Sequence, residues 1–549
     1  MCLVFRNMRN QTFWSFRFFS WCVWYCFWFE ECVNPVRMRT GSCKRAPHGC
    51  IRRYVVCAND CFAHWQLNGP QAAQLGTQAA FPFQLPKFDS KTIAKGCIDY
   101  TDLVALKDGK GGYGEVYKGK SCKGTFALKR QALDGGAAIT NAWHYLSRQR
   151  SQLQAVVRES KIYFLPTLCK GSPNLARLVD IAIVTHQIPS YPDFCVEEPL
   201  LVFYWADAPN NTLRTWMHAH PISTKPELQE RLSLAIQMVI GLKHLHEGDI
   251  VHQDLKPRNM VLFGTKNTPA RLELTDFGMS VKFNGKKKDA RCTAGTRYYM
   301  APEQWLGKSA RSASRDLWAV GMVFVEMFGG IEAYTSMQKY RHEVKNNRIS
   351  QIIPLATDIA RAFKRDAQQS PGSQLSIIRE AIAPLVSACF RQGRELEDAI
   401  SPQNWRPQVS DCEVVLRELW QNIFQFPWSE YRNRIPQPEK SPFQKYKNPD
   451  LLASLYFDLM EKVILRMMKR RCELLVHVVK PLETDFVRKH IAWLNEELRL
   501  SEKNRAVFFR KYLQHEHFAE TRRSSNLPLE PPPVPNLASK VCCSGSNIF

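Results

Sequence analysis

A short stretch near the middle of the chain carries side chains that together could transfer a phosphoryl group. It reads V-H-Q-D-L-K-P-R-N, and within it Asp254 could accept the proton of an attacking hydroxyl. Lys256 could neutralise charge on the transferring group, and Asn259 could bind a metal ion. The D-F-G triplet that follows supplies Asp276, which could hold a Mg²⁺ ion that bridges phosphates. A lone D-F-G is common, whereas this ordered set is not.

A glycine cluster upstream, G-K-G-G-Y-G-E-V, could cradle the phosphates of a nucleotide. Glycines let the backbone come close to phosphates and offer N–H groups to them. On its own the pattern is weak, because a glycine-rich hairpin serving only as a turn would look similar. The nucleotide contacts expected in it are Gly109, Lys110, Gly111, Gly112, Tyr113, Gly114 and Val116.

The residues after the glycine cluster strengthen the nucleotide interpretation. F-A-L-K is a short strand, in which Ala127 could pack on a base and Lys129 could hold phosphate oxygens. A lysine in this role needs an anionic partner to aim it. Glu159 is the one glutamate between Lys129 and Glu197, and it lies in A-V-V-R-E-S, which is plausible as a helix. We therefore expect Glu159 to pair with Lys129, although a surface glutamate is the plainer alternative.

From about Tyr100 to Phe424 these motifs, in this order, resemble the eukaryotic protein kinases. Three further segments add to the resemblance. A-P-E at 301–303 looks like the end of an activation segment, and D-L-W-A-V-G from Asp316 looks like the buried helix whose aspartate ties down the catalytic loop. W-R-P at 405–407 resembles the site whose arginine, here Arg406, pairs with the A-P-E glutamate.

The resemblance implies a fold, an activity and a set of site residues. The fold would be α+β and bilobal, with a β-rich N-lobe and a helical C-lobe, and the activity would be transfer of the γ-phosphate of ATP, with Mg²⁺, to protein serine or threonine. Lys256 and Thr296 match the serine/threonine pattern. The catalytic set would be Asp254, Lys256, Asn259, Asp276, Lys129 and Glu159, with Asn259 and Asp276 as metal ligands. Beside the adenine we expect Ala127, Phe203 as a bulky gatekeeper, Tyr204, Trp205, Ala206 and Val261.

The chain also departs from the family pattern. Gln253 replaces the arginine that usually precedes the catalytic aspartate, so control by phosphorylation of the activation segment is in doubt. Asp108 stands where an apolar residue normally packs on adenine, which could weaken nucleotide binding. Lysines in the activation segment, such as Lys282 and Lys286, would favour acidic peptides beside a substrate groove; a solvated basic loop is the alternative.

The composition and hydrophobic pattern along the chain predict five parts. Strand-like runs precede helical periodicity, which indicates an α+β protein. The predicted parts are 1–65, aromatic and then basic and cysteine-rich; 66–98, a linker; 99–425, the kinase domain, with N-lobe 99–205 and C-lobe 206–425 carrying an insertion at 330–399; 426–520, a helical extension; and 521–549, a disordered tail with proline. In the extension, Leu452, Leu455, Leu459, Val463 and Met467 share one helix face. That face could pack on the protein's own core or bind a partner.

The first 65 residues allow several interpretations. Phe13 to Phe29 is nearly all apolar but is broken by Arg17, so it suits a signal-peptide core better than a spanning helix. A membrane anchor, a secretory signal and a segment absent from the functional protein all remain open. Cys50, Cys57, Cys61 and His64 lack the spacing of a common zinc module. Unpaired cysteine spacing elsewhere favours a cytoplasmic or nuclear protein, with a membrane-anchored or secreted one as the alternative.

The overall charge favours anionic partners without identifying one. The formal net charge is +24, from 75 Lys and Arg against 51 Asp and Glu. We expect protein substrates, among which acidic proteins would be favoured, and we expect no binding of nucleic acid. Three alternatives to an active protein kinase stay open: a pseudokinase scaffold that binds partners without turnover, a small-molecule kinase, and a binder of anionic surfaces. The sequence leaves the oligomeric state and the physiological substrate undetermined.

Overall fold

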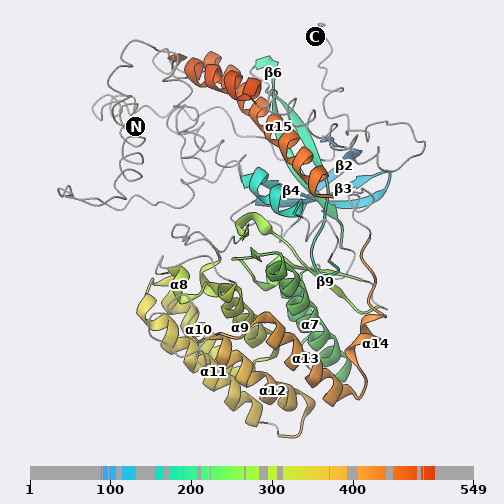
Figure 1. Ribbon diagram of the computed structural model, residues 1–549, viewed down its shortest axis with the longest axis vertical. Coiled ribbons are helices and arrows are strands. Elements are labelled where there is room, and N and C mark those ends of the chain that lie inside the picture. Colours follow the sequence, from blue (N-terminus) through green and yellow to red (C-terminus); the bar gives the residue numbers. More distant parts are fainter. Residues whose placement is uncertain are drawn as a thin grey trace, which may run out of the picture.

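The computed structural model describes somewhat more than half of the chain, and every structural statement below concerns that part. The described residues are 88–89, 91–96, 98–106, 114–131, 155–165, 172–188, 191–206, 212–222, 224–264, 268–282, 295–305, 313–369, 371–391, 406–439, 449–478, 484–485 and 487–500. Strands occupy one end of the molecule and helices the other, with helix α15 (Pro449–Val478) lying across the strand end (Figure 1). The predicted α+β fold with two lobes is confirmed.

The strand end is a closed barrel in the order β1-β2-β3-β4-β6-β5, with all neighbours antiparallel. Its strands are β1 (Ala94–Lys95), β2 (Asp99–Ala105), β3 (Gly114–Ser121), β4 (Gly124–Gln131), β5 (Leu178–Ile188) and β6 (Tyr191–Tyr204). The two-residue β1 closes the barrel by pairing with both β2 and β5. The barrel therefore begins a few residues before position 99, inside the stretch that the sequence predicts to be a linker.

Alternation along β4 separates the barrel interior from the functional face. Phe126 and Leu128 point inward and are buried, because successive side chains of a strand face opposite sides. Ala127 and Lys129 therefore share the other face. Inside the barrel, the β4 residues pack with side chains from the remaining strands, among them Tyr100, Leu103, Tyr117, Val184 and Leu200.

The helical end is built around helix α9 (Ser314–Phe328), of which every residue but Glu326 is buried. A helix that is apolar on all sides needs partners on all sides. Helices α10 (Ile331–Lys345) and α12 (Gln374–Cys389) contact α9 directly. Helices α7 (Lys225–Glu247), α11 (Ile352–Gln368), α13 (Val409–Phe424) and α14 (Trp428–Arg432) contribute to the same core cluster. Helices α10 to α12 occupy the greater part of the stretch predicted as an insertion.

The start of helix α7 coincides with a capping box in its sequence. Thr224 and Glu227 form a capping box: the Glu227 amide donates to Thr224 Oγ1 at 3.4 Å, and the Thr224 amide donates to Glu227 Oε2 at 3.0 Å. This arrangement satisfies two amides that a helix start otherwise leaves unpaired. The long helix that follows supports the loop in which Asp254 lies.

A buried ion pair joins two distant parts of the helical lobe, as the sequence predicts. Arg406 and Glu303 have fully buried side chains, and Arg406 Nη2 donates to Glu303 Oε2 at 2.9 Å. Burial alone would raise the pKa of Glu303, but the charge of Arg406 outweighs it and lowers that pKa. The pair's contribution to stability is therefore present at neutral pH and is lost as the pH falls through the lowered pKa.

We expect Arg406→Ala to lower the free energy of unfolding by about 3–5 kcal/mol, because it leaves a buried carboxylate without its partner. The matched control is Arg365→Ala, whose ion pair with Glu332 is 54% and 36% exposed and should be worth less than about 1 kcal/mol. Urea unfolding of the two variants checks the prediction. Equal, small losses would contradict a structural role for the buried pair.

Candidate active site

The loop that carries Asp254 is tied to the core of the helical lobe by one carboxylate. Asp316 of α9 is 1% exposed, and it accepts hydrogen bonds from the backbone amides of His252 and Gln253, both at 2.8 Å. His246 Nε2 lies 2.9 Å from the same carboxylate. Burial would raise the pKa of Asp316, but the contacts with His246 and His252 lower it. The carboxylate is thus held ionised, which fixes the loop as the sequence predicts.

Asp254 is surrounded by donors that fix its carboxylate in place. Lys256 Nζ lies 2.6 Å from Asp254 Oδ2, and the Thr296 amide donates to Asp254 Oδ1 at 2.6 Å. Lys256 also donates to Thr296 Oγ1 at 2.7 Å, and Asn259 Nδ2 donates to Asp254 Oδ2 at 3.2 Å. A carboxylate held in this way can orient a hydroxyl and take its proton. The structure therefore brings together the four residues that the sequence assigns here.

Thr296 reaches this network because a glycine precedes it. Gly295 has a φ of +131°, in the region that disfavours L side chains, and a Cβ there would lie 2.8 Å from the Gln253 carbonyl oxygen. The close approach of the two backbone segments lets the Thr296 amide meet Asp254. Gly295 is a positioning residue that the sequence reading did not single out, although it stands directly before Thr296.

Lys129, Glu159 and Asp276 form a three-way ion pair between the lobes. Lys129 Nζ lies 2.7 Å from Glu159 Oε1 and 2.5 Å from Asp276 Oδ1. Glu159 is fully buried, on the helix at 155–163 (the Glu159 helix). Burial lowers the pKa of Lys129, but the charges of Asp276 and Glu159 outweigh this and raise it; in turn the charge of Lys129 lowers the pKa of Asp276 against the effect of burial. The predicted pairing of Lys129 with Glu159 is confirmed.

A row of aromatic rings in tilted and edge-on contact links the Glu159 helix to the catalytic loop. Tyr163 lies 5.1 Å from Phe203 and 5.0 Å from Phe277, and Phe277 lies 5.4 Å from His252, measured between ring centroids. The sequence reading missed Tyr163. The signal was available, because Tyr163 lies four residues after Glu159 and so falls one helical turn away on the same side.

Several residues predicted to contact the nucleotide share one face of the barrel. Val116 pairs directly with Lys129, and Ala127 pairs with Phe203, so each pair lies on one side of the sheet. In strand β8 (Met260–Phe263), Val261 is half-buried and lies on the face opposite to that of Met260. Gly114 is buried at the start of β3. Gly109, Lys110, Gly111, Gly112 and Tyr113, together with Asp108, lie outside the described residues.

Tyr204, Trp205 and Ala206, which lie at the end of β6 and directly after it and are called the hinge here, do not all face the same way. Tyr204 packs on Phe126, whose side chain is inside the barrel, at 6.0 Å between ring centroids. Burial and the neighbouring Glu439 carboxylate raise the pKa of Tyr204 to about 12. Trp205 instead lies 4.8 Å from Lys118 Nζ, and Ala206 is buried. The Tyr204 ring therefore packs toward the barrel interior, and the place of Tyr204 beside the adenine stays a prediction.

Asn259 and Asp276 fit a Mg²⁺ ion by the chemistry of their donors. Asn259 Nδ2 donates to the Asp254 carbonyl oxygen at 2.9 Å, so its amide oxygen remains as a ligand. The Thr275 amide donates to the Asn259 carbonyl at 2.9 Å, which brings Asn259 next to the D-F-G segment. Within the described residues no group of three or more His, Cys, Asp or Glu forms a metal site by itself. Mg²⁺ is commonly held by one or two such oxygens together with substrate phosphates.

Two other predicted features fall partly outside the described structure. Lys282 is exposed on strand β10 (Val281–Lys282), whereas Lys286 and its basic neighbours lie outside the described residues. The aromatic segment Phe13–Phe29 and the residues Cys50 to His64 also lie outside. Among the described helices, none combines the length and hydrophobicity that crossing a membrane requires.

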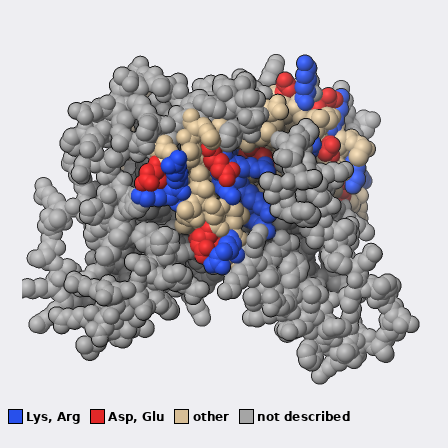
Figure 2. All heavy atoms as spheres, turned by 90° about the horizontal axis from the view of Figure 1, so that it is seen from above, with Lys and Arg blue, Asp and Glu red and all other residues tan. Residues whose placement is uncertain are grey.

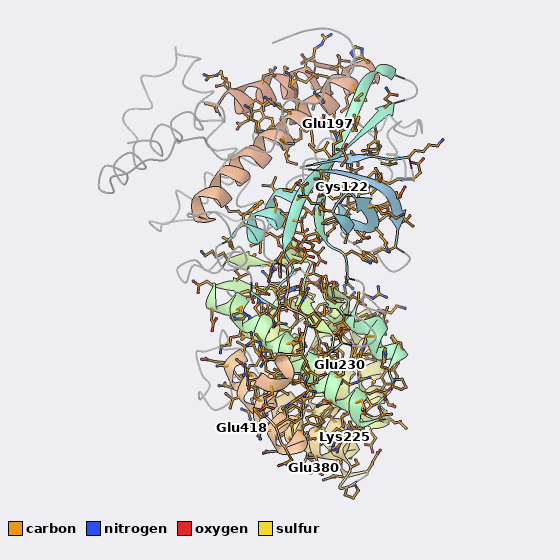
Figure 3. The ribbon with its side chains drawn as sticks, turned by 90° about the vertical axis from the view of Figure 1, so that its right-hand side faces the viewer. Cys122, Glu197, Lys225, Glu230, Glu380 and Glu418 are labelled. Atoms are coloured by element: carbon orange, nitrogen blue, oxygen red, sulfur yellow. The ribbon has the colours of Figure 1, made fainter. Side chains whose placement is uncertain are left out.

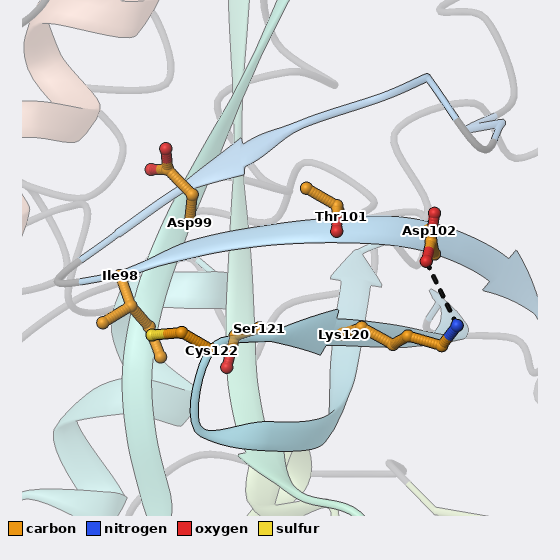
Figure 4. A pocket seen from close by; sticks show the side chains of 7 residues that line it. All are labelled: Ile98, Asp99, Thr101, Asp102, Lys120, Ser121 and Cys122. Carbon is orange, nitrogen blue, oxygen red and sulfur yellow. Dashed lines mark ion pairs between the residues drawn. The ribbon is translucent and has the colours of Figure 1, made fainter.

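The surface pocket between β2 and β3 is separate from this site (Figure 4). It is lined by Ile98, Asp99, Thr101, Asp102, Lys120, Ser121 and Cys122. Lys120 lies four residues along β3 from Val116, at the far end of the strand, and pairs with Asp102 at 3.2 Å. We therefore assign the nucleotide to the face of Lys129 and not to this pocket.

Comparison with known proteins agrees with the geometry. The family model described as "Protein kinase domain" matches residues 104–395, more than half of the chain. Cyclin-dependent kinase 14 of Xenopus tropicalis is 28% identical over 239 residues, which are 44% of this chain and 48% of that protein. Serine/threonine-protein kinase SSN3 of Scheffersomyces stipitis is 28% identical over 234 residues, 40% of this chain and 49% of that protein.

A third relative matches over a shorter region. The mitogen-activated protein kinase homolog NTF3 of Nicotiana tabacum is 30% identical over 155 residues, 27% of this chain and 41% of that protein. The chain thus spans about half the length of the curated relatives it matches.

Proposed function

Because the chain belongs to the protein kinase family, we propose that it is an active kinase that transfers the γ-phosphate of ATP to serine or threonine of proteins. The observation that carries this proposal is the state of the site. The Lys129–Glu159 pair is closed, Lys129 reaches Asp276, and Asp254 is held by Lys256, Thr296 and Asn259. A phosphoryl-transfer site works mainly by positioning and electrostatics, so an assembled set of charges favours turnover.

Each residue has a role that follows from its contacts. Asp254 accepts the acceptor hydroxyl's proton, and Lys256, already beside that carboxylate, offsets negative charge on the moving phosphoryl group. Lys129, aimed by Glu159, holds phosphate oxygens at the barrel face. Asn259 and Asp276 would hold Mg²⁺, which would supply positive charge that neutralises the phosphates. Val116 and Ala127 exclude water from the base.

The specificity for serine and threonine rests on the Lys256–Thr296 contact. Lys256 Nζ donates to both Asp254 and Thr296 and so lies directly beside the proton acceptor. A short hydroxyl side chain can reach Asp254 in this arrangement. The name of one relative, a serine/threonine-protein kinase, supports the same class.

The experiment is Mg²⁺-dependent transfer from labelled ATP to a mixed set of acidic and basic proteins, followed by identification of the phosphoamino acids. We expect phosphoserine or phosphothreonine from the wild-type chain and none from Asp276→Ala, which loses a metal ligand. Thermal melting establishes that both chains are folded. A preference for acidic proteins would support the proposed basic substrate groove. Absence of transfer from the folded wild-type chain to every substrate would favour the pseudokinase scaffold.

We also propose that the site does not depend on a phosphorylated activation segment. Gln253 is 5% exposed, and its neutral amide offers no positive charge to a phosphate. The names of the cyclin-dependent relatives state a need for a cyclin, so the assay is run on the chain alone. Activity of the chain alone would argue against the same need here.

The third alternative, a binder of anionic surfaces, gains no support from the described top of the molecule. Seen from above, Lys and Arg side chains there lie among Asp and Glu side chains (Figure 2). Mixed charges give a weaker field than a patch of one sign. We therefore place catalysis, and not electrostatic recruitment, first.

A further inference from the structure

The C-terminal extension packs on the barrel by an apolar cluster that is separate from the two main cores. Helix α15 contributes Ile464, Met467, Met468, Cys472, Leu474 and Leu475, and the helix at 487–500 contributes Val487 and Leu494. Val196 of β6 is buried in the same cluster, and Ile183 of β5 packs against it. The extension thus packs against the β5–β6 pair, and α15 lies along β6 (Figure 1).

Two adjacent arginines fix α15 to β6 at Glu197. Arg471 is 1% exposed, and its Nη2 donates to the Glu197 backbone carbonyl at 2.7 Å. Arg470 pairs with the Glu197 carboxylate. Figure 3 labels Glu197 on its strand beside the C-terminal helices. Lys469, one residue earlier, makes its ion pair within the helix, with Glu473 at 3.6 Å. The two arginines therefore set where α15 sits along the strand, and Lys469 does not.

The same cluster reaches the Glu159 helix. Val157 packs against the cluster, two residues before Glu159. At 3.6 residues per turn these two side chains point about 200° apart around the helix axis. The Glu159 helix is thus held between the C-terminal extension on one side and Lys129 on the other. A helix of this length depends on such packing, because short helices are marginal by themselves.

The segment that leads to α15 is attached beside the hinge. After α14, the carbonyl oxygen of Pro436 accepts from Arg271 Nη1 at 3.0 Å. The carbonyl oxygen of Glu439 accepts from Arg177, which immediately precedes β5. The Glu439 carboxylate also lies by the hydroxyl of Tyr204, where β6 ends. The extension is therefore anchored at the junction of the lobes before it crosses the barrel.

We propose that the C-terminal extension is a built-in positioning element, which holds the Glu159 helix where Glu159 can pair with Lys129. The inference rests on the proposed kinase function, because the pair matters through phosphoryl transfer. When α15 is docked, the packing on Val157 favours the closed pair. When it is released, the Glu159 helix keeps its contacts with the main core but loses the packing on Val157, and the population with a closed pair falls. Met467, Arg470 and Arg471 are then positioning residues for catalysis.

The test uses the full chain and two readouts, hydrogen exchange of residues 155–163 and kcat. Met467→Asp places a charge in the buried cluster, and we expect faster exchange at 155–163 and a kcat lower by about 100-fold or more. The KM for ATP should change less than kcat. The control is Val414→Asp at a position of α13 that is 54% exposed, which should change neither readout. Unchanged protection of α9 establishes that the helical lobe stays folded.

A charge reversal provides the milder test. We expect Arg470→Glu to lower kcat by about fivefold at most, the range of a partly exposed ion pair, and Glu197→Arg in the same chain to restore it. Lys469→Glu, the matched change one residue away, should have no comparable effect. Unchanged exchange at 155–163 while α15 itself becomes unprotected would overturn the inference. Exchange does not need turnover, so an inactive chain that shows the exchange effect would contradict the proposed function and not the docking.

Discussion

Replacing Asp254 by asparagine is expected to lower kcat by about 10²- to 10⁴-fold, the usual contribution of a positioned proton acceptor. The asparagine keeps the size of the side chain but loses its negative charge. Its amide nitrogen would also face a donor, because Lys256 Nζ and the Thr296 amide both point at the Asp254 oxygens. We expect the affinity for ATP to change little, since Lys129 and Asp276 remain in place.

Steady-state kinetics with a serine-containing substrate and direct titration of ATP binding measure the two quantities separately. Asp358→Asn is the matched control, because Asp358 has a side chain that is 48% exposed and pairs with Arg361 on the surface of α11. A loss of kcat below tenfold in Asp254→Asn, with ATP binding intact, would contradict the assignment of Asp254 as proton acceptor.

Replacing Lys129 by methionine is expected to abolish most transfer and also to destabilise the fold. Lys129 is 11% exposed and neutralises two carboxylates, those of Glu159 and Asp276. Without it the two carboxylates lie near each other with no cation between them. Removing one partner of a buried ion pair lowers the free energy of unfolding by about 3–5 kcal/mol. Because Lys129 keeps some exposure to solvent, we expect a loss toward the lower end of this range.

The destabilisation should depend on pH in a direction that the charges determine. In Lys129→Met the two carboxyl groups would hold a shared proton more tightly than in the unfolded chain, because like charges raise the pKa. The native state then binds more protons, so the stability deficit shrinks as the pH falls from about 7 toward 5. Urea unfolding at both pH values, without nucleotide, measures this change.

The double variant Lys129→Met with Glu159→Gln provides the control for that interpretation. Removing one of the two carboxylates should recover a large part of the lost stability while leaving transfer abolished. A deficit that is the same at both pH values, and that Glu159→Gln does not reduce, would show that the three residues are not an ion-pair network.

The sequence predicts those parts of the site whose residues lie close together along the chain. Asp254, Lys256 and Asn259 lie within six residues, so a single loop conformation places all of them. Glu159 was identifiable because no other glutamate was available, even though 30 residues separate it from Lys129. Tyr163 was missed because an aromatic residue on a helix is ordinarily a core residue, and only its contacts with Phe203 and Phe277 give it a role.

The remaining differences come from contacts that no local pattern specifies. β1 has two residues, too few to show the alternation by which a strand is predicted. The apolar face of α15 was apparent from its periodicity, and Val463 and Met467 do pack on the protein's own cluster, as one of the two interpretations held. Periodicity says that a face is apolar but not which surface covers it, so the docking on β6 beside the Glu159 helix required the structure.

The most direct test of the account is the number of phosphates that one chain transfers when no partner protein is present and none of its own residues is phosphorylated. The chain is treated with phosphatase, separated from it, and given saturating ATP, Mg²⁺ and a serine- or threonine-containing protein. We predict many phosphates per chain on serine or threonine, because the charged groups of the site are already in place. A folded chain that binds ATP but transfers none would contradict the proposed activity and make it a binding scaffold.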